Sequence, residues 1–434
     1  MAEQVKVIGA GLAGAEAALY LAKKGIKVVL YDIKPNAYTP AHKSENFSEL
    51  VCSNSLKSND IYGNAAGLLK EEMRMLGSEI IAVADKTRVP AGNALAVDRE
   101  LFSQIITQKI KEEKNITVVS EEVEDIDFNQ YTIVATGPLT TQTLSENIKQ
   151  RFGGALSFFD ASAPIIDFES IDMENAFFGD RYDKGEADHI NCPMDKATYT
   201  EFITQLKGAK RAELHGFEDS SVFEGCMPVE VMANRGQDTL RFGPLKPAGL
   251  TDPKTGRWPY ACLQLRKENV QGSAYNMVGF QTNLTWGEQK RVFSIIPALK
   301  NAEFLKYGVM HRNTYVNSPK ILSADYSLKD NPKVSFAGQI TGVEGYVESA
   351  GSGLMAGIYT AGKILGKDIP LISEKTVLGS LARYITTENV DFQPMNANFG
   401  VLPPLERIIR DKAERKKIMA ERSLSAVAEF IKEI

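Results

Sequence analysis

A strand, a glycine-rich turn and an alanine-rich helix open this chain and constrain its fold more than any other feature. The turn has the pattern G-x-G-x-x-G. In a dinucleotide site the first glycine permits the tight turn, the second lets the backbone approach a pyrophosphate, and the third lets the helix pack closely on the strand. The N-terminus of the helix then presents free N–H groups to the phosphates. We therefore expect a dinucleotide cofactor contacted by Gly9, Ala10, Gly11, Leu12, Ala13 and Gly14.

Three other parts of the sequence extend this candidate site. A second strand over residues 27–31 ends at Asp32, where a carboxylate can accept hydrogen bonds from ribose hydroxyls. Two further strand ends carry glycines, at residues 135–137 and 338–345, and one sheet can bring all these segments to a single extended cofactor. A glycine-rich fold that binds nothing is the alternative. The added candidate contacts are Asp32, Gly137, Gly338, Gln339, Gly342, Glu344 and Gly345.

The spacing of the glycine segments predicts a fold that is discontinuous in sequence. With 434 residues, the chain is long enough for two or three domains. The plan resembles that of two-dinucleotide-binding flavoproteins, which implies FAD, with permanently held NAD as the alternative. We expect an α/β protein with a doubly wound, Rossmann-like FAD-binding domain over residues 1–165 and 306–434. A smaller α+β domain for substrate and RNA is expected between them, over residues 166–305.

Composition and charge narrow the class of protein. Hydrophobic residues make up 43% and charged residues 24%, as in soluble globular proteins. There is no apolar run of eighteen residues and no room for a signal peptide before the first strand, so we expect a cytoplasmic protein without membrane spans. Four scattered cysteines and four histidines favour neither a disulfide framework nor a metal site. The net charge of −5 argues against a general attraction to nucleic acid but permits a local basic face.

Between the glycine segments, the sequence predicts a coarse series of helices and strands. Residues 34–66 are rich in Pro, Asn and Ser and predict a long loop, which is a frequent place for function. Hydrophobic periodicity supplies the remaining elements. These are helices at 68–75, 99–113 and 404–434, and strands at 116–120 and 131–135.

Long sequence strings connect the whole chain to a known family. They read LVCSNSL from Leu50, VPAG from Val89, FEGCMP from Phe223, YGVMHRNT from Tyr307 and QPMNANFG from Gln393. In these strings the chain closely resembles the folate- and FAD-dependent tRNA (uracil-5-)-methyltransferases, a family with relatives that methylate ribosomal RNA. A related branch, the large glucose-inhibited-division type of tRNA-modifying flavoproteins, shares the first and third glycine segments but carries extra C-terminal domains. One departure is Gln339, where most two-dinucleotide flavoproteins have an aspartate.

The resemblance implies a specific chemistry. It implies a tightly bound FAD, methylenetetrahydrofolate as carbon donor, NADPH or NADH as reductant, and a uridine in structured RNA as acceptor. Carbon 5 of uracil is a poor nucleophile, and a thiolate that adds to carbon 6 converts the ring into an enolate able to attack a methylene. The flavin supplies the hydride that completes the methyl group. A stacked uridine must first be flipped into the pocket.

Two of the four cysteines match motifs of the family. The resemblance gives Cys226 the role of covalent nucleophile toward the base. It gives Cys52 the role of base at carbon 5, or of protecting the reactive flavin, and the two roles can be exchanged. A buried, inert thiol is the alternative for each. Cys192 and Cys262 match no motif, and we expect them to be structural.

Basic residues interleaved with aromatic ones predict contacts to RNA. One cluster lies in the inserted region, beside Phe242, Trp258 and Tyr260, and another lies near the C-terminus. A solvated charged face is the alternative for both. The segment His311-Arg312-Asn313 is a candidate to orient flavin, folate or base, or else forms a structural turn. The basic residues are Arg235, Arg241, Lys246, Lys254, Arg257, Arg266 and Lys267, then Arg407, Arg410, Lys412, Arg415, Lys416, Lys417 and Arg422.

The leading hypothesis is an RNA uracil-5 methyltransferase that uses folate and FAD. Its acceptor is the T-loop of tRNA or a uridine of large-subunit ribosomal RNA, which the residues do not separate. Two alternatives come from other classes: a flavin-bound RNA-binding protein with inert thiols, and a generic NAD(P)H flavin oxidoreductase for a small molecule. The sequence leaves open a homodimer and the choice between NADH and NADPH.

Overall fold

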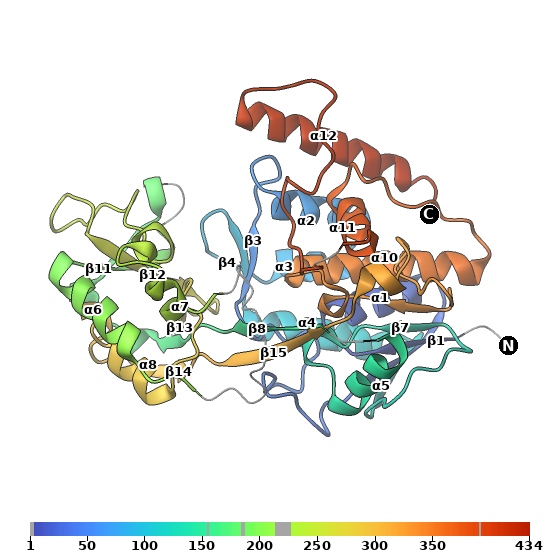
Figure 1. The fold of residues 1–434 in the computed structure, drawn as a ribbon, viewed down its shortest axis with the longest axis horizontal. Coiled ribbons are helices and arrows are strands. Elements are labelled where there is room, and N and C mark those ends of the chain that lie inside the picture. The colour runs from blue at the N-terminus through green and yellow to red at the C-terminus, as the bar shows by residue number, and fades with distance from the viewer. Residues whose placement is uncertain (1–3, 154–155, 184–186, 213–226, 390–391) are drawn as a thin grey trace.

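Two lobes joined by a short ribbon make up the molecule (Figure 1). One lobe contains the parallel sheet and both ends of the chain, and the other is inserted between strands of the first. The ribbon pairs β8 (Leu156–Ala161) with β15 (Met310–Tyr315) in antiparallel fashion. This computed structural model describes residues 4–153, 156–183, 187–212, 227–389 and 392–434.

The first lobe is built on a five-stranded sheet in the order β16-β7-β1-β2-β6, with every neighbouring pair parallel. Val5 and Val7 of β1 are completely buried, as expected for a parallel sheet covered on both faces. Strand β16 follows the insertion in sequence and yet pairs with β7, which confirms the expected discontinuous, doubly wound fold. The strands are β1 (Gln4–Ile8), β2 (Lys27–Asp32), β6 (Ile116–Ser120), β7 (Thr132–Val134) and β16 (Val334–Phe336).

Two helices made largely of small residues form the closest contact of this lobe. A Cβ atom added to Gly353 of α10 would lie 2.1 Å from the carbonyl oxygen of Ala13 in α1, and one added to Gly357 would lie 3.3 Å from Cα of Ala17. The small residues of α10 thus permit a close backbone approach, and the partner is helix α1. The helices of the lobe are α1 (Leu12–Lys23), α2 (Ala65–Met75), α3 (Glu79–Lys86), α4 (Arg99–Glu112), α5 (Gln142–Phe152), α9 (Ser318–Ile321), α10 (Tyr346–Leu365), α11 (Val377–Thr386) and α12 (Lys412–Phe430).

A small three-stranded sheet corrects the prediction of one uninterrupted loop over residues 34–66. Strand β3 lies within that segment and pairs with β5, which in turn pairs with β4. The local sequence is mostly polar and shows no strand periodicity. The strand forms because β5, a distant segment, supplies its pairing partner. The three strands are β3 (Ser55–Ser58), β4 (Arg88–Val89) and β5 (Ala94–Val97).

The inserted lobe has its own antiparallel sheet and its own core. The sheet has the order β10-β11-β12-β13-β9-β14, and its core contains the mutually packed rings of Phe202, Phe280 and Phe293. This agrees with the expected smaller α+β unit, while its exact boundaries stay a prediction. Its elements are β9 (Ile165–Asp167), β10 (Phe177–Phe178), β11 (His189–Met194), α6 (Lys196–Gly208), α7 (Val229–Asn234), β12 (Ala261–Lys267), β13 (Ala274–Met277), α8 (Trp286–Phe293) and β14 (Phe304–Lys306).

The C-terminal helix is shorter than the sequence predicted. Helix α12 begins at Lys412 rather than near residue 404, because Asp411 caps it by accepting a hydrogen bond from the N–H of Glu414 at 2.7 Å. Its apolar face buries Met419, Ala420 and Val427 against the first lobe. Within the part of the chain that the structure describes, no helix is both long enough and apolar enough to cross a membrane.

A buried carboxylate ties three helices of the first lobe together. Glu72 of α2 accepts hydrogen bonds from the first two N–H groups of α11, those of Val377 and Leu378, at 2.7 and 2.9 Å. It also accepts one from the hydroxyl of Ser423 in α12 at 2.5 Å. Burial raises the pKa of Glu72 to about 7, while the three donors favour the ionised form. The carboxylate thus satisfies the first two N–H groups of α11, while the N-cap residue Thr376 accepts a hydrogen bond from the third, that of Gly379, at 2.9 Å.

We expect Glu72→Ala to lower the free energy of unfolding by about 2–4 kcal/mol, because it leaves buried N–H groups without acceptors. Denaturant unfolding followed by circular dichroism measures this change. The matched control is Glu71→Ala, which removes a partly exposed ion pair with Arg74 from the same helix and should cost less than about 1 kcal/mol. Equal effects of the two substitutions would contradict the capping role.

Candidate cofactor and substrate site

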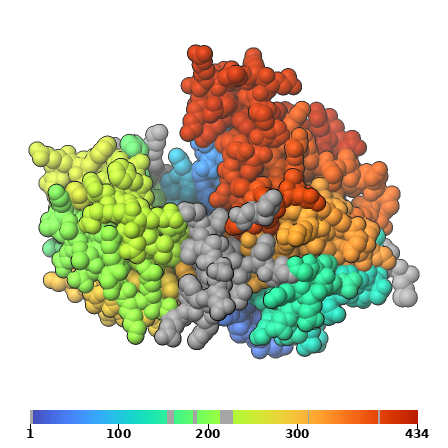
Figure 2. Space-filling view, viewed as in Figure 1, coloured from blue at the N-terminus to red at the C-terminus, as the bar shows by residue number. Residues whose placement is uncertain are grey.

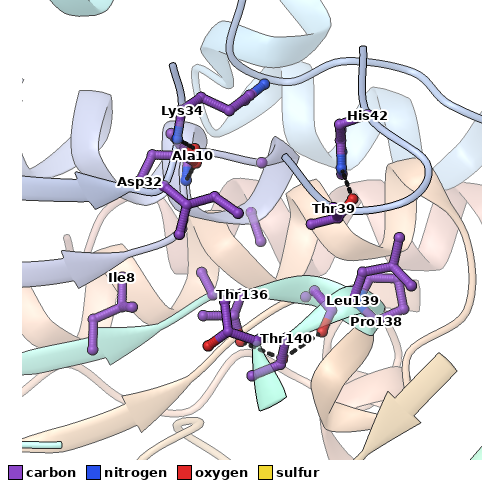
Figure 3. Close-up of a pocket in the computed structure, with 18 of the residues that line it drawn as sticks. Ile8, Ala10, Asp32, Lys34, Thr39, His42, Thr136, Pro138, Leu139 and Thr140 are labelled. Carbon is purple, nitrogen blue, oxygen red and sulfur yellow. Dashed lines mark hydrogen bonds between the residues drawn. The ribbon is translucent and has the colours of Figure 1, made fainter. Parts of the chain in front are cut away.

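The three glycine segments meet around one cavity at the carboxyl ends of the parallel strands (Figure 3). This first cavity has a volume of about 1170 Å³, including its open mouth. Such an edge of an open α/β sheet is the usual place for a ligand. Residues from all three segments line it: Gly9, Ala10, Gly11, Leu12, Ala13, Ala135, Thr136, Gly137, Gly338 and Gln339.

The glycine-rich turn has the geometry that each glycine was expected to provide. Gly9 has a φ of +97°, and a Cβ at Gly14 would lie 1.8 Å from the carbonyl oxygen of Gly9. Only glycine fits these two positions without rearrangement. A Cβ at Gly11 would meet no protein atom within 4 Å, and Gly11 borders the cavity. The space beside Gly11 is therefore available for a ligand to approach the backbone closely.

The N-terminus of helix α1 contributes partial positive charge to the cavity, and Asp32 contributes a carboxylate. Gly11 caps α1 without a side-chain hydrogen bond, and the first turn holds no acidic residue, so its N–H groups and dipole favour an anion. The Asp32 carboxylate accepts from the N–H groups of Ala10 and Lys34, at 2.8 and 3.0 Å. Each of its oxygens keeps a further lone pair for a hydroxyl donor. Figure 3 shows Asp32 and Ala10 facing Thr136 across the cavity.

A second cavity adjoins the first and shares part of its wall. It has a volume of about 1180 Å³, counted in the same way, and reaches into the interface between the lobes. Because they share wall residues, the two cavities lie side by side. The shared residues are Val51, Pro138, Leu139, Gln339 and Tyr346.

The wall of the second cavity includes the N-terminus of α10. Gly345 caps this helix with a φ of +124° and without a side-chain hydrogen bond. Beside it, the amide of Gln339 donates to the carboxylate of Glu344 at 2.6 Å. Glu348 of the first turn accepts from the ammonium of Lys57 at 2.7 Å, which partly neutralises its charge. In this chain Gln339 therefore acts as a neutral donor where an aspartate would add a second negative charge.

Cys52 lies on the wall of the second cavity and is half-buried. Its N–H donates to the phenol oxygen of Tyr346 at 2.7 Å, and its Sγ lies 3.8 Å from the carbonyl oxygen of Ala161. Burial raises the pKa of Tyr346 far above its ordinary value, so the phenol stays neutral. The loop that carries Cys52 is thereby fixed to the start of α10.

Three buried or half-buried cations surround the Cys52 loop. The guanidinium of Arg266 donates to Oγ of Ser53 at 2.6 Å, and Lys306 and Arg99 donate to the carbonyl oxygens of Val51 and Leu50 at 2.9 and 2.8 Å. Burial, together with the positive charge of Arg99, lowers the pKa of Lys306 to about 8. Neighbouring cations are a common way to activate a thiol.

Asn313 presents an unsatisfied donor to the second cavity. Its side chain is 3% exposed, and within the described part of the chain its Nδ2 has no hydrogen-bond partner. A buried amide without a partner costs stability, so such groups are often reserved for ligands. Asn313 of the predicted segment 311–313 thus lines the second cavity, while the side chains of His311 and Arg312 lie outside what the structure describes.

Not every predicted residue lies where the sequence placed it. Gly14 and Gly342 line neither cavity. Both are packed closely inside the protein instead, since a Cβ at Gly14 would collide with the backbone of Gly9 and one at Gly342 with the ring of Phe392. Glu344 and Gly345 line the second cavity. Cys226 lies outside the described residues, so its role stays a prediction.

The described residues on either side of residues 213–226 bond to the same short segment of the inserted lobe. The N–H of Ala212 donates to the carbonyl oxygen of Asn283 at 2.8 Å, and that of Val229 donates to Gln281 at 2.7 Å. Gln281 itself lines the second cavity. Val229 is therefore bound directly to a residue of this wall.

The other two cysteines are structural, as expected. Cys192 and Cys262 are completely buried in the inserted lobe, on the neighbouring strands β11 and β12. Burial raises the pKa of Cys262 to about 12 and that of Cys192 well above its ordinary value. Among the described residues, no group of three or more His, Cys, Asp or Glu side chains is arranged to hold a metal ion.

The structure separates the predicted RNA contacts into exposed and internal residues. Arg266 is internal, because it binds the Cys52 loop, and Arg241 stacks on Tyr260 at 3.7 Å. Near the C-terminus, Lys416 and Arg422 donate to carbonyl oxygens of the same chain. The exposed members are Arg235, Lys246, Lys254, Arg257, Arg407, Arg410, Lys412, Arg415 and Lys417.

Sequence reasoning missed several residues that close the first cavity. Lys34, His42 and Glu49 come from the loop after β2, and Glu121 and Glu122 follow β6. The N–H groups of Lys43 and Ser44 donate to the carboxylate of Glu49, which orders this loop. For Lys34, Glu121 and Glu122, a place directly after a strand of the parallel sheet is the signal that could have found them.

Comparison with known proteins gives close relatives over the full length. The family model described as glucose inhibited division protein A matches residues 4–368. The chain is 56% identical over 433 residues to a methylenetetrahydrofolate–tRNA-(uracil-5-)-methyltransferase TrmFO of Acetivibrio thermocellus, covering 99% of each chain. It is 54% identical over 435 residues to the TrmFO of Staphylococcus aureus, covering all of both chains.

Solved structures show the same fold. The chain is similar to GidA of Aquifex aeolicus in two crystal forms, with TM-scores of 0.69 and 0.72 and sequence identities of 18% and 17%. The similarity covers 100% and 98% of this chain and 76% of the GidA chain. On the strength of the full-length identities, this chain belongs to the TrmFO family, within the wider group that the glucose inhibited division protein A model describes.

Proposed function

We propose that this protein transfers a methylene from methylenetetrahydrofolate to carbon 5 of a uridine in tRNA and reduces it to a methyl group, with FAD as its cofactor. The observation that carries the proposal is the 54–56% identity, over the full length, to relatives named for this reaction. The geometry supports it, because the half-buried thiol of Cys52 borders a cavity that shares wall residues with the dinucleotide-type cavity.

The residues that line the two cavities fit FAD. The N-terminus of α1 and the open approach at Gly11 suit a pyrophosphate, and the Asp32 carboxylate suits a ribose. The isoalloxazine ring would then lie beside Tyr346, where the second cavity begins. When bound, the flavin supplies the hydride that reduces the transferred carbon. NADPH or NADH is the proposed source of that hydride.

Two thiols share the proposed work on the base. Cys226 is assigned the addition to carbon 6 of uracil, because Val229, three residues later, is bound to the wall of the second cavity. Cys52 is assigned the proton at carbon 5, because the Cys52 loop is surrounded by Arg266, Lys306 and Arg99. Exchange of the two roles remains the alternative.

The surface offers a place for a large anionic acceptor. Figure 2 shows the molecule hollowed between the yellow-green residues of the inserted lobe and the red residues near the C-terminus. Exposed Lys254 and Arg257 belong to the inserted lobe, and exposed Arg407 and Arg410 precede α12. Cations on both lobes would contact phosphates of a folded RNA. Ribosomal RNA is the second acceptor to test, since it presents the same base and the same phosphates.

The cysteines provide the first test. The purified protein is incubated with labelled methylenetetrahydrofolate, NADPH and either unmodified tRNA or ribosomal RNA. We expect label in tRNA, no transfer by Cys226→Ala, and a rate lowered about 10²- to 10⁴-fold by Cys52→Ala. Cys192→Ala is the control, because its sulfur is buried in the inserted lobe, and should methylate normally.

Each of the following outcomes would contradict part of the proposal. Full activity of Cys226→Ala would exclude the covalent scheme. Label only in ribosomal RNA would change the acceptor. Label in neither RNA, or a purified protein that does not take up FAD, would exclude the methyltransferase.

The unsatisfied amide of Asn313 provides the second test. We expect Asn313→Leu to lower kcat/KM about 5- to 150-fold, since a ligand loses its hydrogen-bond donor, while the melting temperature stays equal or rises. The control is Asn191→Leu, because the Asn191 amide is buried with its hydrogen bonds made to Gly179 and Gln264, and its loss should lower the melting temperature. A less stable Asn313→Leu protein with normal kcat/KM would show that the amide is structural.

A further inference from the structure

Three aromatic rings form a parallel stack at the edge of the inserted lobe. The ring of Tyr307 lies between those of Trp286 and Phe304, with centroid distances of 5.6 and 5.1 Å and interplanar angles of 10° and 7°. Phe304 packs against the core of the lobe, whereas Trp286 exposes 62% of its surface. Trp286 therefore stacks on Tyr307 and still leaves much of its indole ring open to solvent.

Buried hydrogen bonds fix the backbone next to Tyr307. The amide of Gln289, a completely buried residue of α8, both donates to the carbonyl oxygen of Gly308 and accepts from its N–H, each at 2.8 Å. A Cβ at Gly308 would lie 2.6 Å from the carbonyl oxygen of Ser162, so the chain after Tyr307 has no room to shift. An exposed tryptophan on a fixed support loses little conformational freedom when a second ring stacks on it.

The stack is also connected directly to the proposed substrate cavity. Lys306, which precedes Tyr307, donates to the carbonyl oxygen of Val51 next to Cys52. Val309, which follows Gly308, accepts a hydrogen bond at 2.8 Å from the N–H of Ser162, a residue that lines the second cavity. Figure 1 shows strand β15 running from the region of α8 and β14 towards the first lobe.

Three exposed cations lie close to the start of α8. Lys290 stands four residues after Trp286 on α8 and so lies on the same side of the helix. The backbone of Lys210 pairs with Thr285, and that of Arg211 pairs with Leu284, so two more exposed cations flank the helix start. The nearby carboxylate, Glu288, is already engaged by Arg291.

We infer that the open face of Trp286 is a stacking platform for an unpaired RNA base that neighbours the flipped uridine. A flat, parallel aromatic stack with cations at its rim fits a nucleobase and its phosphate, and every base offers such a face. The inference rests on the proposed function, since it places the RNA beside the same cavity. It adds Trp286 to Phe242 and Trp258, the exposed rings that the sequence predicted to stack on RNA bases.

Tryptophan fluorescence provides a direct test, because the chain has two tryptophans. In Trp258→Phe the emission comes from Trp286, and we expect it to be quenched on titration with unmodified tRNA but not with folate. Trp286→Ala should weaken tRNA binding about 5- to 150-fold, whereas Trp286→Phe should keep most of the affinity. The matched control is Phe178→Ala, which removes an exposed ring from β10. Strand β10 forms one edge of the sheet of the inserted lobe, and β14, which carries Phe304 of the stack, forms the other edge.

The outcomes separate this inference from the proposed function. If the wild-type protein methylates tRNA and the Trp286→Ala variant binds tRNA with normal affinity, the stacking platform is overturned while the proposed methyltransferase function stands. Absence of methylation by the wild type would overturn the proposed function first. A change in sedimentation caused by Trp286→Ala, without a change in tRNA affinity, would assign the ring to contact with a second copy of this chain and would equally overturn the platform.

Discussion

The contact between helices α1 and α10 is the constraint on which the candidate site depends. The glycine-rich turn stands at the start of α1, and the segment from Gly338 to Tyr346 stands at the start of α10. Because Gly353 meets the backbone at Ala13, the two helix N-termini are brought to the same edge of the sheet. A side chain at position 353 would collide with the backbone of α1 at Ala13.

The interface between the lobes provides the second half of the site. Arg266 and Lys306 belong to the inserted lobe, and both hold the loop that carries Cys52 in the other lobe. Their charges are largely removed from water, which is costly unless partners compensate. Such an arrangement persists where it serves a function, and here it fixes a thiol beside a cavity. It also explains why a basic residue that the sequence assigned to RNA, Arg266, is internal.

Several features were predictable because they rest on local rules. The turn at residues 9–14 needs glycine for steric reasons that hold in any surroundings, and the strand ends at Asp32 and Gly338 follow from short-range patterns. The long sequence strings predicted the family, which the comparisons confirmed. By contrast, the pairing of β3 with β5 was not predictable, since no local pattern records which distant strand will supply the partner.

The sequence alone determined the glycine turns, the discontinuous α/β plan, the family and the two candidate cysteines, because these are carried by residue types at fixed spacing. Only the tertiary structure decided which side chains meet. It placed Cys52 among three cations, left the amide of Asn313 without a partner among the described residues, and stacked Trp286 on Tyr307. The physical reason is that burial, charge balance and ring stacking depend on segments far apart in the chain, whose meeting is set by packing of the whole fold.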